Sequence, residues 1–393
     1  MRLAAFFALV FALAIATHAP LCAQNATVLP AQDRALAVQY ERLFSIGAAD
    51  GRDWEILNGV TRVAFDKDGR LYVLDTGNAR VLLFDASGRF IRQIGRRGSG
   101  PGEFQAAAGL TVLADGTLVV GDAAAGLVLF DARGEYLRSV QLGEIRVLYP
   151  SIQADGSGGV VMHETATSRV TPRITELYRH TLRAGTSAAV RLELPRGDTT
   201  IGQTGQTASG FSRVLPAVFS PTVRFAVWGP GRIAVATDDK YEIRVDGNGG
   251  VTRLSRAIAP RAVTERDREA VREARRARAA RSTSTAAVQG FAVRNPTGAE
   301  LEAELRALRF AETVPVIAGI GADAAGRLWI ARVGPVAPGD GPIDIVAPVG
   351  RYRGTLPATS LPAAFGPNDR IARIVVDDEG VERVVVARVV GLR

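Results

Sequence analysis

Short apolar stretches that alternate with polar positions run along most of the chain, and turns rich in Asp and Gly separate them. The pattern is clearest in residues 60–94 and 109–140, where each stretch has the length of one β-strand. The two segments align at a step of 46 to 47 residues, with Asp75 matching Asp122, Phe84 matching Phe130 and Gly88 matching Gly134. A repeat of this length built from short strands is typical of a propeller blade.

Weaker copies of the same pattern begin near residues 150, 223, 317 and 370. The period is broken once, over residues 261–311, and the remaining length accommodates six copies. We therefore predict an all-β fold, a six-bladed β-propeller over residues 24–393 with a helical insertion between blades four and five. Closing the ring requires one terminus to complete the blade made by the other, because an unpaired strand edge promotes aggregation. Residues 36–47 are expected to add the outer strand of the last blade.

The interruption at residues 261–311 has the composition of two helices. Thr264 and Asp267 resemble an N-terminal cap, and an arginine-rich stretch follows. Further on, Leu301, Leu305 and Leu308 form an apolar stripe at helical spacing, beside which Glu302 is placed to pair with Arg306. Two interpretations remain open. In one the leucines pack on the propeller face. In the other the arginine-rich helix gates the channel or binds an acidic partner, with candidate docking residues Arg272, Arg275 and Arg276.

The glycine-rich stretch QIGRRGSGPGEFQ, residues 93–105, raises the question of phosphate binding. A Walker loop needs Lys and Ser or Thr directly after its last glycine, but Pro101 and Gly102 stand there. A dinucleotide-binding loop needs a helix after the glycines, whereas a strand-like alternation follows at residue 109. The stretch is better explained as a connector between two blades, in which glycine permits turns with positive φ.

The first copy, with this connector, resembles the NHL repeat, and the chain resembles exported bacterial six-bladed propellers. The matching repeat positions include Gly69, Asp75, Asn78, Arg80, Phe84, Asp85 and Gly88, and the connector adds Gly100, Gly102 and Phe104. We expect Asp75 and Asn78 to bond to turn backbone and Arg80 to stack or pair beside them. The second copy has neither this Asn nor this Arg. Propellers of this kind include binding scaffolds, sensors and enzymes, so the resemblance does not identify an activity.

Composition and the N-terminus indicate export. A basic start, an apolar run over residues 3–17 and a small residue at Ala23 are typical of a signal peptide that occupies residues 1–23. Leu21 before Cys22 disfavours a lipoprotein signal. Without residues 1–23 the chain has no cysteine, and its later apolar runs are too short to span a membrane. We predict a periplasmic or secreted monomer. The net charge of +8 is concentrated in residues 261–281, but no aromatic residues alternate with the arginines there, and nucleic acid is therefore not expected as a partner.

Candidate catalytic residues are scarce. His163 and His180 are the only histidines after the signal peptide, too few for a catalytic zinc site, and we expect both to be surface or loop residues. There is no G-x-S-x-G motif. Glu55 and Asn58 resemble, weakly, the first motif of gluconolactonase-like propellers, which hold calcium at the channel mouth. We therefore expect a non-catalytic binding or scaffold protein for a protein or small-molecule partner, without a cofactor. The alternative is a calcium-dependent lactonase or related hydrolase.

Overall fold

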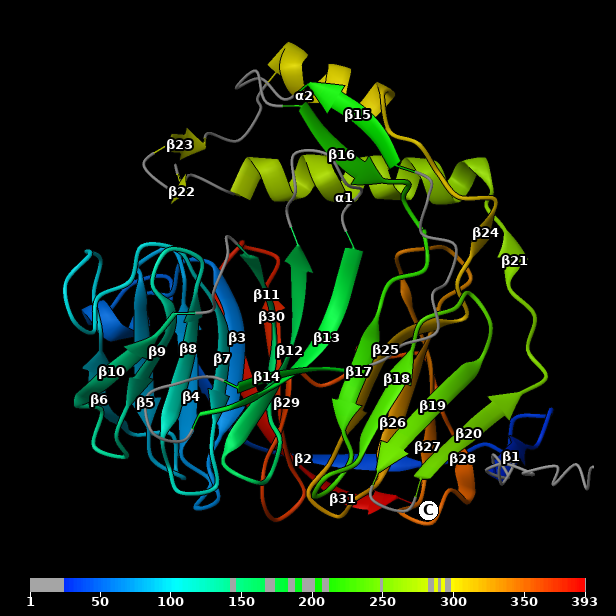
Figure 1. Cartoon of the computed structure of the whole chain (residues 1–393), viewed down its shortest axis with the longest axis horizontal. Helices are drawn as coiled ribbons and strands as arrows, with labels where there is room; N and C mark the ends of the chain where they lie inside the picture. Colours follow the sequence, from blue (N-terminus) through cyan, green and yellow to red (C-terminus); the bar gives the residue numbers. More distant parts are fainter. Residues whose placement is uncertain are drawn as a thin grey trace, which may run out of the picture.

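Six sheets of four or five strands form the blades of a ring in this computed structural model (Figure 1). The structure describes residues 25–141, 146–166, 174–182, 188–192, 202–206, 212–247, 250–281, 286–288, 291–293 and 298–392. The predicted signal peptide, residues 1–23, lies outside these ranges. The prediction of a six-bladed β-propeller is confirmed.

Blades 1 to 3 follow one another along the chain, and each begins at its innermost strand. Blade 1 contains β3 (Val60–Phe65), β4 (Leu71–Asp75), β5 (Arg80–Phe84) and β6 (Phe90–Ile94). Blade 2 contains β7 (Ala107–Val112), β8 (Leu118–Asp122), β9 (Gly126–Phe130) and β10 (Tyr136–Val140). Blade 3 contains β11 (Arg146–Ala154), β12 (Gly159–Ala166), β13 (Ile174–Thr181) and β14 (Ala188–Leu192).

Blades 4 to 6 complete the ring. Blade 4 contains β17 (Arg224–Val227), β18 (Ile233–Ala236), β19 (Glu242–Gly247) and β20 (Gly250–Arg256). Blade 5 contains β25 (Ile317–Ala322), β26 (Leu328–Val333), β27 (Asp340–Val346) and β28 (Tyr352–Leu356). Blade 6 contains β29 (Ala364–Phe365), β30 (Arg370–Val376), β31 (Glu382–Leu392) and, from the N-terminal region, β2 (Val38–Ile46). The predicted closure by residues 36–47 is therefore confirmed, since β2 pairs antiparallel with β31.

The N-terminal segment does more than close blade 6. Strand β1 (Asn25–Leu29) pairs in parallel with β20 and gives blade 4 a fifth strand. Ala35 then bridges to Thr355 of β28 in blade 5. Asp33 accepts hydrogen bonds from Arg256 and Arg332, both at 2.7 Å. Residues 25–46 thus cross the outer edges of three consecutive blades, which the sequence pattern did not predict.

Apolar packing between blades stabilises the ring. The buried residues of the described chain fall into six clusters, and each cluster lies between two adjacent blades. Middle strands such as β4 and β5 are buried along their whole length because both of their faces are covered, whereas the outer strand β6 is largely exposed. The cluster between blades 3 and 4 contains Val161, Leu177, Phe225, Ile233 and Val235 among the described residues.

The helical insertion lies between blades 4 and 5, as predicted. It begins and ends in a two-stranded stem of β21 (Arg261–Ala262) and β24 (Thr313–Val314). Between them lie α1 (Glu265–Arg281), the hairpin of β22 (Ala286–Val288) and β23 (Phe291–Val293), and α2 (Gly298–Arg306). A second insertion, not predicted, forms a hairpin of β15 (Gly202–Gln206) and β16 (Ser212–Pro216) between blades 3 and 4.

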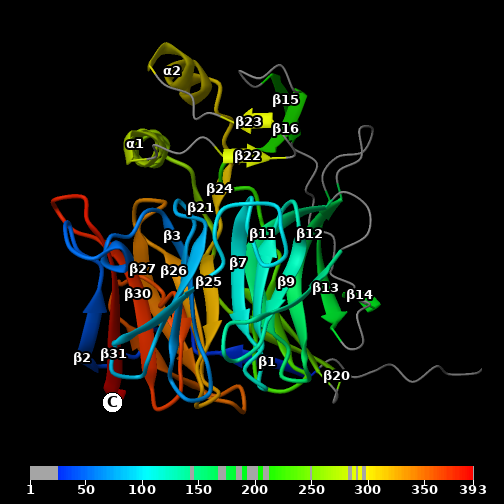
Figure 2. The same ribbon diagram turned by 90° about the vertical axis from the view of Figure 1, so that its left-hand side faces the viewer.

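Both insertions lie on the same face of the ring (Figures 1 and 2). We call α1, α2, the two hairpins and their stem the cap, and the covered side the cap-side face. In every blade the innermost strand begins at this face, because both insertions join the outer strand of one blade to the inner strand of the next. Figure 2 shows α1 end-on over one side of the ring, β15–β16 over the other side and β22–β23 between them.

Candidate functional site

The two insertions contact each other and form one cap. Residues 217–220, which follow β16, run beside residues 309–311, which follow α2. Val218 N donates to Arg309 O at 2.8 Å, and Ala311 N donates to Val218 O at 2.9 Å. The ring of Phe310 lies 6.0 Å from that of Phe219, and Arg268 of α1 lies 5.4 Å from its centroid. Connectors from two blade junctions are therefore joined above a single channel mouth.

One buried carboxylate fixes the start of α1 to the propeller. Asp267 accepts two hydrogen bonds from Arg261, both at 2.7 Å, and one from Ala337 N at 2.8 Å. Ala337 lies in the loop between β26 and β27 of blade 5. Thr264 N donates to the same carboxylate at 2.9 Å, which confirms the predicted helix cap. These donors, led by the Arg261 guanidinium, hold the pKa of Asp267 well below its usual range.

Helical geometry assigns two faces to α1. The buried residues Asp267 and Val271 define the face toward the propeller, and one to two turns further on the same stripe reaches Arg275 and Arg278, both exposed. The opposite face carries Arg276, which bonds to Glu302 of α2 at 2.8 and 3.1 Å. Arg275 also lies near Glu304 of α2, so this part of α1 faces the second helix of the cap as well.

The three candidate docking arginines differ in their surroundings. Arg272 pairs with Glu265 and Glu269, each at 3.0 Å, and Arg276 pairs with Glu269 and Glu302. Both of these ion pairs lie within the cap. Arg275 has no ion pair among the described residues, and burial lowers its pKa.

Within α2, Leu305 is buried, and Leu301 and Leu308 are partly buried. In the described chain Glu302 forms its ion pair with Arg276 of α1 rather than with the predicted Arg306. The reason is that α1 passes beside α2 and presents a guanidinium that binds both carboxylate oxygens.

The residues of the repeat motif around Arg80 stabilise the turns of blade 1. Asp75, fully buried, accepts hydrogen bonds from Asn58 N, Asn78 Nδ2 and Arg80 Nε at 2.9, 2.8 and 2.9 Å. Arg80 also donates to the carbonyls of Asp53 and Ile56 at 2.8 and 3.0 Å and pairs with the Asp53 carboxylate. In blade 2 the equivalent Asp122 accepts four backbone N–H groups, from residues 105, 106, 124 and 125. In both copies, the shared Asp therefore holds the segment that leads into the inner strand of the blade.

The remaining motif residues serve turns and the connector. Asp85 accepts backbone N–H groups from Ser87 and Arg89, at 2.8 and 2.9 Å. Gly95 has φ +70°, and a Cβ there would lie 2.3 Å from the ring of Phe104, which is fully buried. The turn positions Gly69, Gly88 and Gly102 also have positive φ. Gly100 N donates to Glu103 at 2.9 Å. The side chain of Phe104 thus packs in the interface between blades 1 and 2 and holds the connector against it.

Glu55, a candidate calcium ligand, has its carboxylate in a local hydrogen bond, and the other candidate, Asn58, packs beside the turn at Gly77. Glu55 lies in a short 3-10 helix, η1 (Asp53–Glu55), and its carboxylate accepts Arg52 N at 2.7 Å. The amide N–H of Asn58 bonds to Asp75, and its side chain lies where a Cβ on Gly77 would be. Within the described ranges, no three His, Cys, Asp or Glu side chains group as a metal site requires. Neither described helix is long and apolar enough to cross a membrane.

Both histidines are in strands, so the expectation of surface or loop positions was wrong. His163 on β12 and His180 on β13 are buried in blade 3. The His163 ring lies 4.9 Å from that of Phe225 on β17, edge to face. Burial and the nearby charge of Arg224 lower the pKa of His163 to about 4. The alternation of the strands places both side chains inside blade 3.

A polar cluster lies beside His163 where blades 3 and 4 meet the channel. Arg224 begins the inner strand β17 and donates to Ala318 O, on the inner strand of blade 5, at 2.6 Å. Its other contacts are the carbonyl and hydroxyl of Thr222, and within the described chain no carboxylate pairs with it. Burial lowers the pKa of Arg224 although its side chain is partly exposed. Nearby, Gln153 joins β11 to β17 through Phe225 O and Val227 N.

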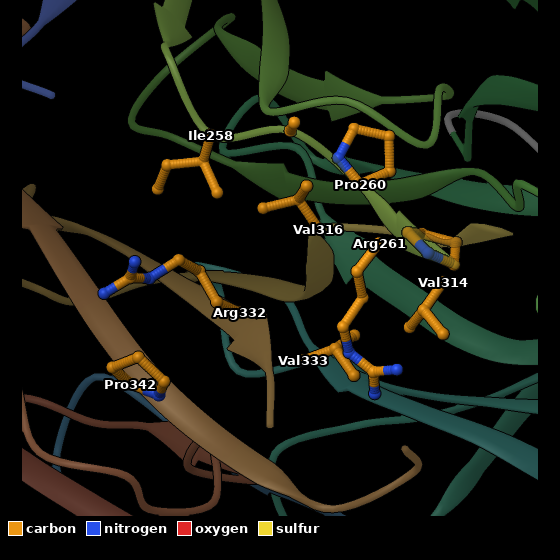
Figure 3. A pocket seen from close by; sticks show the side chains of 10 residues that line it. Ile258, Pro260, Arg261, Val314, Val316, Arg332, Val333 and Pro342 are labelled. Carbon is orange, nitrogen blue, oxygen red and sulfur yellow. The ribbon is translucent and has the colours of Figure 1, made fainter. Parts of the chain in front are cut away.

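A small pocket lies at the base of the cap stem (Figure 3). It has a volume of about 170 Å³ and lies between the chain leaving blade 4 and the strands of blade 5. Its walls are apolar, from residues such as Ile258, Val316 and Pro342, and two arginines border it. Arg261 is bound by Asp267 and Arg332 by Asp33, so both guanidinium groups already have anionic partners.

The comparisons with known proteins support the fold. A family model, DUF5128, described as a 6-bladed beta-propeller, matches residues 52–150. This region contains the segment that resembles the NHL repeat, and the matching model is a different propeller family. The chain is similar in structure to a protein of Bacteroides fragilis described as exported, with a TM-score of 0.50 and 11% identity over 93% of this chain and 100% of the other.

A member of the DUF4221 family from Bacteroides vulgatus gives a TM-score of 0.53 at 10% identity, covering 92% of this chain and 100% of the other. Regucalcin of Agrobacterium tumefaciens, a calcium-binding protein, gives a TM-score of only 0.38 at 13% identity, covering 93% and 97%; that likeness is too low to support a calcium site. No curated protein matches the sequence. At these identities the similarity establishes the propeller fold and not an activity.

Proposed function

We propose that this protein is an exported, monomeric, non-catalytic binding propeller that takes a small ligand at the capped end of its channel. The observation that carries the proposal is the composite cap. Two separate insertions extend from the same face, and they join through residues 217–220 and 309–311. Ligand sites in folds of this kind usually lie in concave regions bounded by loops on a rigid scaffold.

The surroundings of the mouth favour binding over catalysis. Near the starts of β17 and β25, Arg224 lies beside the backbone carbonyl of Ala318, and groups of this kind bind and orient ligands. The carboxylate of Glu55, one candidate metal ligand, already accepts a backbone N–H group in a local turn. The proposal needs no metal ion, and chelation is expected to leave ligand binding unchanged. Export is supported by the signal-like residues 1–23 and by the description of the Bacteroides fragilis relative as exported.

The test compares a blocked and an unblocked mouth. Ala318 is an exposed residue on an inner strand near Arg224, so Ala318→Trp fills the mouth without entering an inter-blade core. Val349→Trp is the matched control, because Val349 is 86% exposed at a turn on the opposite face. Residues 24–393 of each form are incubated with a small-molecule extract and analysed by native mass spectrometry. A bound mass in wild type and Val349→Trp that disappears in Ala318→Trp is expected; equal retention by all three forms would reject the site.

A further inference from the structure

We propose that the pocket at the base of the cap stem is a second binding site, and that it takes a small neutral aromatic molecule with a single ring. The pocket has a volume of about 170 Å³ and lies where the chain leaving blade 4, the stem and blade 5 meet (Figure 3). The inference goes beyond the ligand proposed for the channel, because Ala318 is not among the residues that line this pocket.

The size and the walls of the pocket favour a compact apolar ligand. Pro260, Pro315 and Pro342 line it, and proline has no backbone N–H to donate. Apart from two arginines, the other lining residues are alanine, valine and isoleucine. A sugar would lose hydrogen bonds to water in such surroundings. An apolar cavity of about 150 Å³ holds one benzene molecule, so a single ring matches the available space.

The two lining arginines favour a neutral aromatic ring over an anion. Arg261 is already bound by Asp267 through two hydrogen bonds of 2.7 Å, and Arg332 is bound by Asp33 at 2.7 Å. These hydrogen bonds use the edges of the planar guanidinium groups and leave their faces for stacking. The negative face of an aromatic ring attracts a guanidinium group that lies over it.

Another arginine of this chain binds a carboxylate and stacks on a ring at the same time. Arg256 binds Asp344 at 2.8 Å, and the central carbon of its guanidinium group lies 4.8 Å from the centroid of the Tyr352 ring. Within the described ranges, no aromatic side chain makes this contact with Arg261 or Arg332. A ring in the pocket would give these arginines the contact that Tyr352 gives Arg256.

Binding is measured by NMR titration of residues 24–393 labelled with ¹³C in the methyl groups of isoleucine and valine. Benzyl alcohol is the aromatic probe, and cyclohexylmethanol is a probe of similar size without a π-system. Benzyl alcohol is expected to shift the methyl resonances of Ile258, Val316 and Val333 and to bind about two- to fivefold more tightly than cyclohexylmethanol, which is the gain from one cation–π contact. Equal affinity for the two probes, or no shift of these resonances at the solubility limit of benzyl alcohol, would overturn the inference.

The location is tested by filling the pocket. Val333→Trp adds an indole at a half-buried lining position. Val349→Trp is the matched control, because Val349 is 86% exposed and does not line the pocket. Benzyl alcohol is expected to bind at least about tenfold more weakly to Val333→Trp, a loss of about 1.4 kcal/mol, and to bind the control as it binds wild type.

Ala259→Trp, at an exposed lining position, is the second blocking variant and takes the place of Val333→Trp if that protein does not fold. Wild-type affinity in a folded blocking variant would overturn the inference. If Ala318→Trp abolishes binding of benzyl alcohol and the blocking variants do not, the probe binds in the channel. In that case the inference fails and the proposed function stands.

Discussion

At the residue scale, buried ion pairs at the blade entries stabilise the ring. Arg80 is the clearest case, because its guanidinium joins Asp75 to the backbone at Asp53 and Ile56. Replacing it leaves a fully buried carboxylate without its charged partner. We expect Arg80→Met to lower the free energy of unfolding by about 3–5 kcal/mol, measured by urea denaturation. The exposed pair of Arg133 with Asp131 is the control, and Arg133→Gln should change little. Equal stability of both variants would show that Arg80 is not needed to hold residues 53–56, which lead into blade 1.

A second residue-scale prediction concerns pH. The pKa of His163 is lowered to about 4 in the folded protein, chiefly by burial and then by Arg224, whereas an unfolded histidine titrates near 6.5. The unfolded state therefore binds more protons between these values. The stabilising effect of a neutral His163 is complete above pH 6.5 and is lost as the pH falls toward 4.

The size of this effect follows from the separation of the two pKa values and is about 3 kcal/mol. Wild type is expected to lose stability between pH 6.5 and 4.5 more steeply than His163→Gln, whose side chain does not titrate. The measurement is urea denaturation at a series of pH values. Parallel pH profiles for the two proteins would contradict the assigned pKa.

At the element scale, the attachment of α1 depends on Asp267. This carboxylate joins the stem, the first turn of α1 and the blade 5 loop at Ala337. We expect Asp267→Asn to release the start of the helix, because an amide cannot accept all of these hydrogen bonds. In hydrogen exchange, amides of residues 265–281 should exchange faster while those of β8 and β9 in blade 2 stay protected. Glu273→Gln, at an exposed position of the same helix, is the control; unchanged exchange of α1 in Asp267→Asn would show that other contacts hold the cap.

Elements defined by local patterns could be predicted from the sequence, and elements defined by distant partners could not. The blades and the helical insertion were predicted because hairpin turns and helical spacing repeat within short windows. Strand β1 and the hairpin β15–β16 were missed. The first is a five-residue strand whose partner β20 lies more than 200 residues away, and the second is a polar, glycine-containing segment without alternation.

The same division applies to the candidate site. Asp75, Asn78 and Arg80 lie within one turn of the repeat, so their mutual contacts could be anticipated. Arg224 could not be singled out, because its environment is created by Ala318 of the next blade and by His163 of the preceding one. Contacts that join residues of three blades have no signature in a single sequence.

At the scale of the whole molecule, the propeller is a ring of six blades with a cap attached to it at a few points. Six inter-blade clusters stabilise the ring, and the N-terminal segment covers the outer edges of blades 4 to 6. The cap is joined to this ring by its stem and by Asp267, and its two insertions are joined to each other at Val218. The cap is therefore expected to stay over the channel mouth and to restrict access to it.

Residues 24–393 contain no cysteine, so a single introduced thiol can report access to the mouth. The most direct measurement compares the labelling rates of Ala318→Cys and of Val349→Cys on the opposite face, with a small methanethiosulfonate and with a bulky polymer-linked maleimide. With the small reagent, Ala318→Cys is expected to react. With the bulky reagent, Ala318→Cys is expected to react at least about tenfold more slowly than Val349→Cys. Adding Asp267→Asn, which releases the start of α1, is expected to reduce this difference. Equal rates at both positions with both reagents would show that the mouth is open and would contradict the capped site.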